Sequence, residues 1–298
     1  MNSASARDAL LDPEFLASLA GLRILARRVP RGGRHAEHRS RDLGGGLEFR
    51  DFRPYTPGDD FRSIDWNIYR RLGRVVLRLF EEMEDLPLYL APDMSASGWS
   101  EEPPRALAGL KAALALASIS LGQHDPVGLY PFAEDLLDTT PARAGGGRLM
   151  VLADRLASLP RGGGTDFRQS FQRLASLRLR PGLLVILSDF FDPAGLEAVL
   201  ASLTPLRHRL LLVQLLRSED REPTLQGDLH LLDCETGEGI DLSVSAQAVA
   251  SYSEAYDRFQ AGFLDFVQAR GLGYLPLDTD APLLPQIAGL FEAGGMTV

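Results

Sequence analysis

The chain has 298 residues, of which 45% are hydrophobic and 24% are charged, so it is long enough to bury the core of one large domain or two modest ones. Cys234 is the only cysteine, which excludes an intrachain disulfide and favours a reducing compartment. The formal charge is −9, yet residues 21–80 carry fourteen arginines against seven acidic residues, which leaves −16 on the remainder. This asymmetry predicts a basic face on an acidic body, suited to an acidic partner or to the protein's own acidic surface.

The beginning of the chain is predicted to be helical and soluble. The first fifteen residues lack the basic start and apolar run of a signal peptide. Leu10–Arg28 has the pattern of an amphipathic helix, and the polar, basic stretch Pro30–Asp42 is predicted to be a mobile arm. His35 and His38 lie in that arm without a cysteine nearby, which favours a solvated segment over a metal site.

A short structured segment follows the arm. Leu47–Arg53 and Val75–Glu81 are strand-like, and between them Pro57-Gly58 favours a tight turn. Asp59 or Asp60 is predicted to cap a short helix that Gly73 ends. Residues 1–85 are therefore expected to form an N-terminal extension, with residues 86–298 as the main domain.

From residue 86 onward, strand and helix patterns alternate. The apolar runs predicted as strands are Leu86–Ala91, Val127–Phe132, Leu183–Leu187, Leu210–Leu216, Leu229–Leu232 and Gly273–Leu277. The predicted helices are Arg105–Leu121, Arg148–Leu159, Phe167–Leu177, Ala194–Leu203, Ala246–Arg270 and Pro282–Phe291. Nearly all-apolar strands separated by helices predict a doubly wound α/β fold with a mainly parallel sheet, which binds ligands beyond the carboxyl ends of its strands. The most membrane-like stretch, residues 106–122, is interrupted by Lys111 and predicted to be a buried helix.

Oxygen-bearing side chains gather at three of the loops that follow predicted strands. They are Asp93, Ser95, Ser97, Thr165 and Asp189. Two carboxylates and three hydroxyls are the ligands of a hard cation such as Mg²⁺ or Mn²⁺, which takes about six oxygens and keeps several waters. With only two carboxylates the ion keeps net positive charge, so the site is expected to accept a carboxylate from another protein. Asp and Ser are also common as helix caps and turn formers, which is the competing interpretation.

The segment GLEFRDFRPYTPGDDFRSIDWNIYRR, followed by FEEME and the Asp-x-Ser-x-Ser loop, resembles the bacterial domain-of-unknown-function 58 family of von Willebrand factor A-like proteins. The resemblance covers roughly residues 20–290. Its signature residues here are Arg53, Tyr55, Pro57, Gly58, Asp59, Asp60, Arg62, Asp65 and Trp66. Met94 and Gly98 depart from the family pattern without replacing a ligand. We expect a mainly architectural role for the signature, with Trp66 anchoring it by burial.

The resemblance implies a function. By this resemblance, a metal-ion-dependent adhesion site would be formed by Asp93, Ser95, Ser97, Thr165 and Asp189. Members of the family are often linked to MoxR-type AAA+ ATPases and are thought to act as adaptors or co-chaperones in the assembly of other proteins. This chain lacks the N-terminal membrane helices of many relatives, so a soluble, cytoplasmic, non-enzymatic protein with an ATPase partner and a further client is expected.

The alternative function is a metal-dependent phosphatase or hydrolase that uses the same Mg²⁺ site. That chemistry needs a nucleophile and a general acid or base beside the metal. Ser95 stands where an aspartyl-phosphate enzyme would have a second carboxylate, and no histidine lies in a recognisable nucleophile motif. The Gly-rich turns at residues 144–148 and 161–167 do not match a nucleotide-binding loop, and no nucleic-acid partner is expected.

Overall fold

The structure is a computed structural model that describes residues 3–28, 47–57, 59–82, 86–225 and 227–292. The chain divides into two compact units: one comprises Met1–Gly33 and Leu86–Val298, and the other comprises Arg34–Asp85. We call them the α/β unit and the arginine-rich unit. The division predicted at residues 85 and 86 falls at the same point, but the first helices group with the α/β unit. The arm Pro30–Asp42, with His35 and His38, and Gly58 of the family signature lie outside the described residues.

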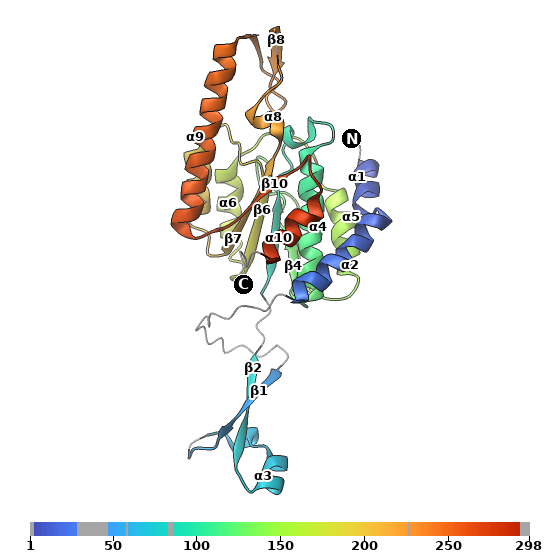
Figure 1. Cartoon of the computed structure of the whole chain (residues 1–298), viewed down its shortest axis with the longest axis vertical. Coiled ribbons are helices and arrows are strands. Elements are labelled where there is room, and N and C mark those ends of the chain that lie inside the picture. The colour runs from blue at the N-terminus through green and yellow to red at the C-terminus, as the bar shows by residue number, and fades with distance from the viewer. Residues whose placement is uncertain (1–2, 29–46, 58, 83–85, 226, 293–298) are drawn as a thin grey trace. The chain divides into compact units, whose positions relative to one another are not determined.

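A six-stranded sheet forms the centre of the α/β unit, in the order β10-β7-β6-β3-β4-β5 (Figure 1). Its strands are β3 (Leu88–Pro92), β4 (Val127–Leu129), β5 (Thr140–Arg143), β6 (Leu183–Ser188), β7 (Arg209–Leu216) and β10 (Gly273–Asp278). All neighbouring pairs are parallel except β4 and β5, which are antiparallel. The predicted α/β fold with a mostly parallel sheet is confirmed, and β5 adds an edge strand that the sequence pattern did not indicate.

Helices cover both faces of this sheet. On one face, α4 (Arg105–Gly122) and α10 (Leu283–Glu292) contact the strands, and α1 (Ser3–Leu10), α2 (Pro13–Arg28) and α5 (Arg148–Ala157) pack against α4 in the same core. The other face packs against α6 (Phe167–Ser176), α7 (Leu196–Leu203) and α9 (Ala246–Arg270). Successive side chains of β3 alternate between these two cores, because Leu88 and Leu90 face the first and Tyr89 and Ala91 the second.

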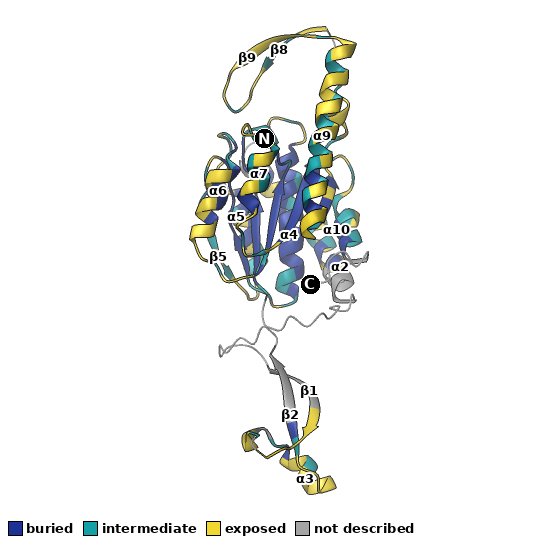
Figure 2. Ribbon diagram, turned by 90° about the vertical axis from the view of Figure 1, so that its left-hand side faces the viewer, coloured by how far each residue is buried: buried dark blue, intermediate teal, exposed yellow. Residues whose placement is uncertain are grey.

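The apolar helix α4 is a core element. It is long and apolar enough to cross a membrane by length and composition, but 72% of that stretch is buried within the protein. Figure 2 shows α4 among the most continuously buried elements, together with the central strands. The prediction of a buried helix here is confirmed, and its apolar composition is explained by packing between the sheet and α2.

A separate hairpin leaves the sheet after β7. Strands β8 (Gly227–Leu232) and β9 (Gly239–Val244) pair only with each other, after the short helix α8 (Ser218–Arg221). The predicted strand Leu229–Leu232 therefore exists but belongs to this hairpin. Asp233 organises its turn, since its Oδ1 accepts hydrogen bonds from the backbone N–H groups of Glu235 and Thr236 at 2.8 and 3.3 Å.

The arginine-rich unit is a β-hairpin with a short helical segment between its strands. Strand β1 (Leu47–Pro54) pairs antiparallel with β2 (Val76–Glu82), and between them lie the 3₁₀ helix η1 (Phe61–Ser63) and α3 (Trp66–Leu72). Asp60 caps η1, whereas Asp65 caps α3 by accepting from the N–H groups of Asn67 and Ile68 at 2.8 and 3.1 Å. Gly73 ends α3 in the left-handed conformation with φ of 66°, as predicted.

The expectation that Trp66 anchors this unit by burial is wrong. Its side chain is 57% exposed and meets Tyr69 edge-to-face, with ring centroids 6.1 Å apart. Trp66 is the first residue of α3, a seven-residue helix none of whose residues is buried. Local polar contacts order it instead: the Nη2 of Arg53 donates to Oδ1 of Asp59 at 2.7 Å, and Thr56 donates twice to Asp59. These hydrogen bonds, led by the one from the Thr56 side chain, lower the pKa of Asp59 to about 2.

Trp66→Ala should therefore leave this unit folded. Because most of the indole is already in water, we expect a loss of less than about 1 kcal/mol. Leu77→Ala is the matched control: Leu77 is only 4% exposed, and its truncation should cost about 2 kcal/mol or more. Hydrogen exchange of the β1 and β2 amides measures both. Loss of protection in Trp66→Ala would contradict the exposed placement.

Candidate metal centre

The predicted site residues meet at the carboxyl edge of the parallel sheet. Asp93 directly follows β3 and Asp189 directly follows β6, and these two strands are hydrogen-bonded neighbours. The N–H of Asp93 donates to the carbonyl of Leu187 at 2.9 Å, which holds the two strand ends together. The topology therefore brings both predicted carboxylates to one place, where a doubly wound sheet binds its ligands.

The loop Asp93–Ser97 is folded around the Asp93 carboxylate. Its Oδ1 accepts from the N–H of Ser95 at 2.9 Å, and its Oδ2 accepts from the hydroxyl of Ser188 at 2.6 Å. The hydroxyls of Ser95 and Ser97 lie 3.1 Å apart. Ser188 was not predicted, although a polar residue closing the apolar run of β6 was a visible signal.

Thr165 reaches this loop through the glycines that precede it. The N–H of Ala96 donates to the carbonyl of Gly163 at 3.0 Å, and the N–H of Gly162 donates to the carbonyl of Met94 at 3.1 Å. Gly162 and Gly163 have φ of 104° and 84°, values that side chains with a Cβ rarely adopt. Their positive φ is what requires glycine here, because a Cβ added at Gly162 or Gly163 would not meet the 93–97 loop; that these glycines serve a metal site stays a prediction.

Asp189 lies between a like charge and a buried cation. Its Oδ2 accepts from Nη1 of Arg105 at 3.3 Å, and its Oδ1 accepts from the N–H of Phe191 at 3.0 Å. Burial and the negative charge of Asp93 raise the pKa of Asp189 to about 7, while Arg105 acts in the opposite direction. Burial likewise raises the pKa of Asp93, against the hydrogen bonds from Ser188 and Ser95.

This arrangement predicts that the metal-free protein loses stability as pH rises. The ordinary pKa of Asp189 is 3.8, so between about pH 4 and pH 7 the folded state holds a proton that the unfolded state has lost. The free energy of unfolding should then fall through that window, by on the order of 3 kcal/mol. Denaturant unfolding with a chelator from pH 5 to pH 8 measures this, and Asp189→Asn should flatten the slope. An equally steep slope in Asp189→Asn would contradict the assignment.

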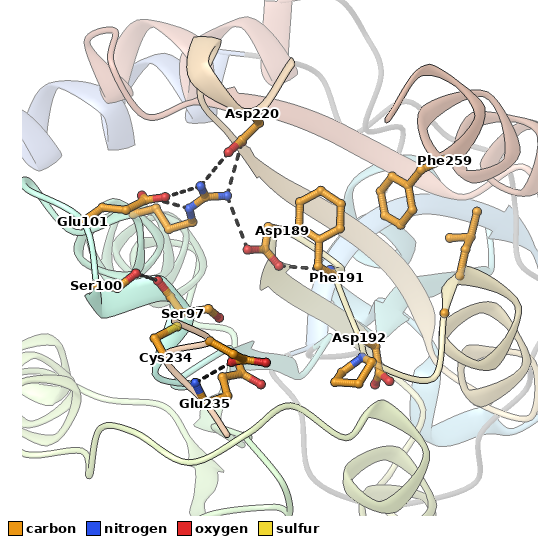
Figure 3. A pocket seen from close by; sticks show the side chains of 15 residues that line it. Ser97, Ser100, Glu101, Asp189, Phe191, Asp192, Asp220, Cys234, Glu235 and Phe259 are labelled. Carbon is orange, nitrogen blue, oxygen red and sulfur yellow. Dashed lines mark hydrogen bonds and ion pairs between the residues drawn. The ribbon is translucent and has the colours of Figure 1, made fainter. Parts of the chain in front are cut away.

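Two charged residues at the site were not anticipated from the sequence. Arg105, from the start of α4, is 7% exposed and pairs with Glu101, Asp189 and Asp220. Glu235, from the β8–β9 turn, accepts from Thr165 through both carboxylate oxygens: the hydroxyl donates to Oε1 and the backbone N–H to Oε2, each at 3.0 Å. Both side chains line a pocket of about 490 Å³ that also includes Ser97 and Asp189 (Figure 3).

The donors fit a hard divalent cation. Within the described ranges, no group of three or more His, Cys, Asp or Glu side chains is placed to hold a metal. A zinc-like site is therefore not built there, and hydroxyls would have to supply much of the coordination. The Ser95 and Ser97 hydroxyls lie 3.1 Å apart, and Ser95, which is 3% exposed, also hydrogen-bonds the Asp93 carboxylate through its side chain. Burial raises the pKa of both Asp93 and Asp189, and a bound cation would stabilise the charged forms of these carboxylates.

Comparison with known proteins identifies the family. Residues 51–261 match the family described as Protein of unknown function DUF58, and the chain belongs to it. The uncharacterized proteins Mb1516 of Mycobacterium bovis and Rv1480 of Mycobacterium tuberculosis are each 28% identical to it over 282 residues, which cover 93% of this chain and 88% of theirs.

Two solved structures are similar to this chain at low sequence identity and low TM-score. An aerotolerance-related membrane protein from Bacteroides fragilis is 15% identical, with a TM-score of 0.41, covering 70% of this chain and 99% of that one. BatB from Bacteroides thetaiotaomicron is also 15% identical, with a TM-score of 0.39, covering 70% of this chain and 98% of that one.

Proposed function

We propose that this protein is a von Willebrand factor A-like module that binds Mg²⁺ or Mn²⁺ and uses the ion to recognise an acidic side chain of a partner protein. The observation that carries the proposal is the meeting of Asp93, the Ser95–Ser97 hydroxyl pair, Thr165 and Asp189 at one edge of the sheet. These are the residues that the sequence singled out as ligands.

The hydrogen bonds within the site indicate which of its oxygens would coordinate the ion directly. Both oxygens of Asp93 and of Asp189 already accept hydrogen bonds from the protein. The hydroxyls of Ser95, Ser97 and Thr165 are thus the candidates for direct coordination, with the carboxylates acting directly or through metal-bound water. When bound, the cation would supply the positive charge that draws in a partner's carboxylate.

The partner and the location are part of the proposal. The family resemblance favours a MoxR-type AAA+ ATPase as partner, with the protein acting as adaptor or co-chaperone for a further client in the cytoplasm. An acidic segment on that ATPase or client would provide the carboxylate, and its binding would require the divalent ion.

The hydrolase alternative has less support in this structure. Of the described histidines, His124 lies shortly before β4 and His208 immediately before β7. Both are therefore at the amino ends of these strands, whereas the site is at the carboxyl ends. His230 is paired with Asp241 across the β8–β9 hairpin at 2.6 Å. None of these three described histidines hydrogen-bonds to Ser95 or Ser97, so the described part of the chain places no histidine base beside either serine.

Titration calorimetry tests the proposal. Mg²⁺ and Mn²⁺ are titrated into the chelator-treated protein, and saturable binding to one site is expected. A pull-down of the MoxR-type ATPase with and without Mg²⁺ then tests partner recognition. Absence of metal binding in the intact chain would overturn the proposal, as would turnover of phosphatase substrates that depends on Ser95.

A further inference from the structure

The β8–β9 turn places a third carboxylate against the predicted metal ligands. Glu235 is seventy positions from Thr165 in sequence, yet its two oxygens accept both the hydroxyl proton and the N–H of that residue. Figure 3 shows Glu235 and its neighbour Cys234 on the same side of the pocket as Ser97.

The direction of the Thr165 hydrogen bond has a chemical consequence. A hydroxyl that donates its proton to a carboxylate has its lone pairs free for a cation and is a better electron donor. Without that acceptor, the Thr165 hydroxyl could turn its proton toward the other oxygens of the site. Thr165 is 8% exposed, so water has little room to replace the carboxylate.

We propose that Glu235 is a positioning residue of the cation site: it fixes the Thr165 hydroxyl as a metal ligand, adds negative charge, and couples the β8–β9 hairpin to metal occupancy. This inference rests on the proposed metal-binding function. It assigns the hairpin a role in the site, where the competing explanation is that Glu235 merely fastens the turn to the loop before α6.

The turn itself supports the assignment. Asp233 accepts the N–H of Glu235, and the N–H of Asp233 donates to the carbonyl of Glu238 at 2.8 Å, so the backbone that carries Glu235 is held in place. On the other side of the loop, Glu134 accepts the N–H of Gly164 at 2.9 Å. Glu134 bonds only backbone there, whereas Glu235 also bonds the hydroxyl of a predicted ligand.

The test compares Mn²⁺ binding in the full chain and in matched variants, by calorimetry and by the electron paramagnetic resonance signal of free Mn²⁺. Glu235→Gln keeps the size of the side chain but removes the charge and one acceptor, and about a tenfold loss of Mn²⁺ affinity is expected. Glu238→Gln removes the same charge from an exposed position of the same turn and should bind like the wild type.

A double-mutant cycle separates positioning from fastening. If Glu235 acts through the Thr165 hydroxyl, Glu235→Gln should weaken Mn²⁺ binding much less in a Thr165→Val background than in the wild type. Hydrogen exchange adds a second measurement: Mn²⁺ should protect the amides of β8 and β9 in the wild type and not in Glu235→Gln.

The outcomes distinguish this inference from the proposed function. If Glu235→Gln binds Mn²⁺ as tightly as the wild type while Asp93→Ala does not bind it, the role of Glu235 is overturned and the metal site is still supported. Equal losses from Glu235→Gln in both backgrounds would overturn positioning through Thr165. No Mn²⁺ binding by the wild-type protein would overturn the proposed function and this inference together.

Discussion

Asp93→Ala should abolish saturable Mg²⁺ and Mn²⁺ binding while the α/β unit remains folded. The Asp93 carboxylate supplies one of the site's charges and also holds the loop, through Ser95 N–H and the Ser188 hydroxyl. Losing those hydrogen bonds should cost about 1–3 kcal/mol. Part of that cost is offset, because the charge that raises the pKa of Asp189 is removed as well.

Calorimetry and a circular dichroism melt, run on the same preparation, measure the two effects separately. Asp192→Asn is the matched control, because Asp192 lies at the same end of the sheet but accepts from the N–H groups of Phe167 and Ala194 instead of from the metal loop. It should keep metal binding. Unchanged Mg²⁺ affinity in Asp93→Ala, or an unfolded Asp93→Ala, would contradict the assignment of this residue.

The sequence was sufficient to predict most of the fold because the central strands are short and apolar on both faces. Leu183–Leu187, for example, has no polar residue and lies in β6 as predicted. β5 was missed because Thr140–Arg143 includes a proline and alternates between partly buried and exposed residues at the sheet edge. Leu229–Leu232 was correctly predicted as a strand but was assigned to the main sheet, because the local pattern does not determine which strand pairs with it.

The same distinction applies to the site. Asp93 and Asp189 were predictable because each directly follows an apolar run, and the sheet topology brings the ends of β3 and β6 together. Arg105 and Glu235 were not, because their contacts join segments that are 84 and 70 positions apart. The prediction that Trp66 is buried was wrong for another reason: aromatic residues are commonly buried, but the arginine-rich unit leaves this one 57% exposed.

Arg105→Ala is expected to cause the largest loss of stability among the variants considered. Burial alone would lower the pKa of Arg105, yet the hydrogen bonds that it donates to Glu101 and the charges of Asp189 and Asp220 raise it, so the guanidinium stays charged. Removing one partner from a buried ion-pair network leaves uncompensated charge and typically costs about 3–5 kcal/mol. Arg221→Ala breaks an exposed pair with Asp257 and should cost less than about 1 kcal/mol.

Denaturant unfolding of Arg105→Ala at several pH values distinguishes a loss of charge balance from a loss of packing. Without the guanidinium, the pKa of Asp189 should rise further, so acid should protonate the carboxylates and restore part of the stability. The loss should therefore be larger at pH 8 than at pH 5. A loss independent of pH would mean that Arg105 stabilises the fold mainly through its aliphatic stem, and that the charge on Asp189 is balanced by other groups.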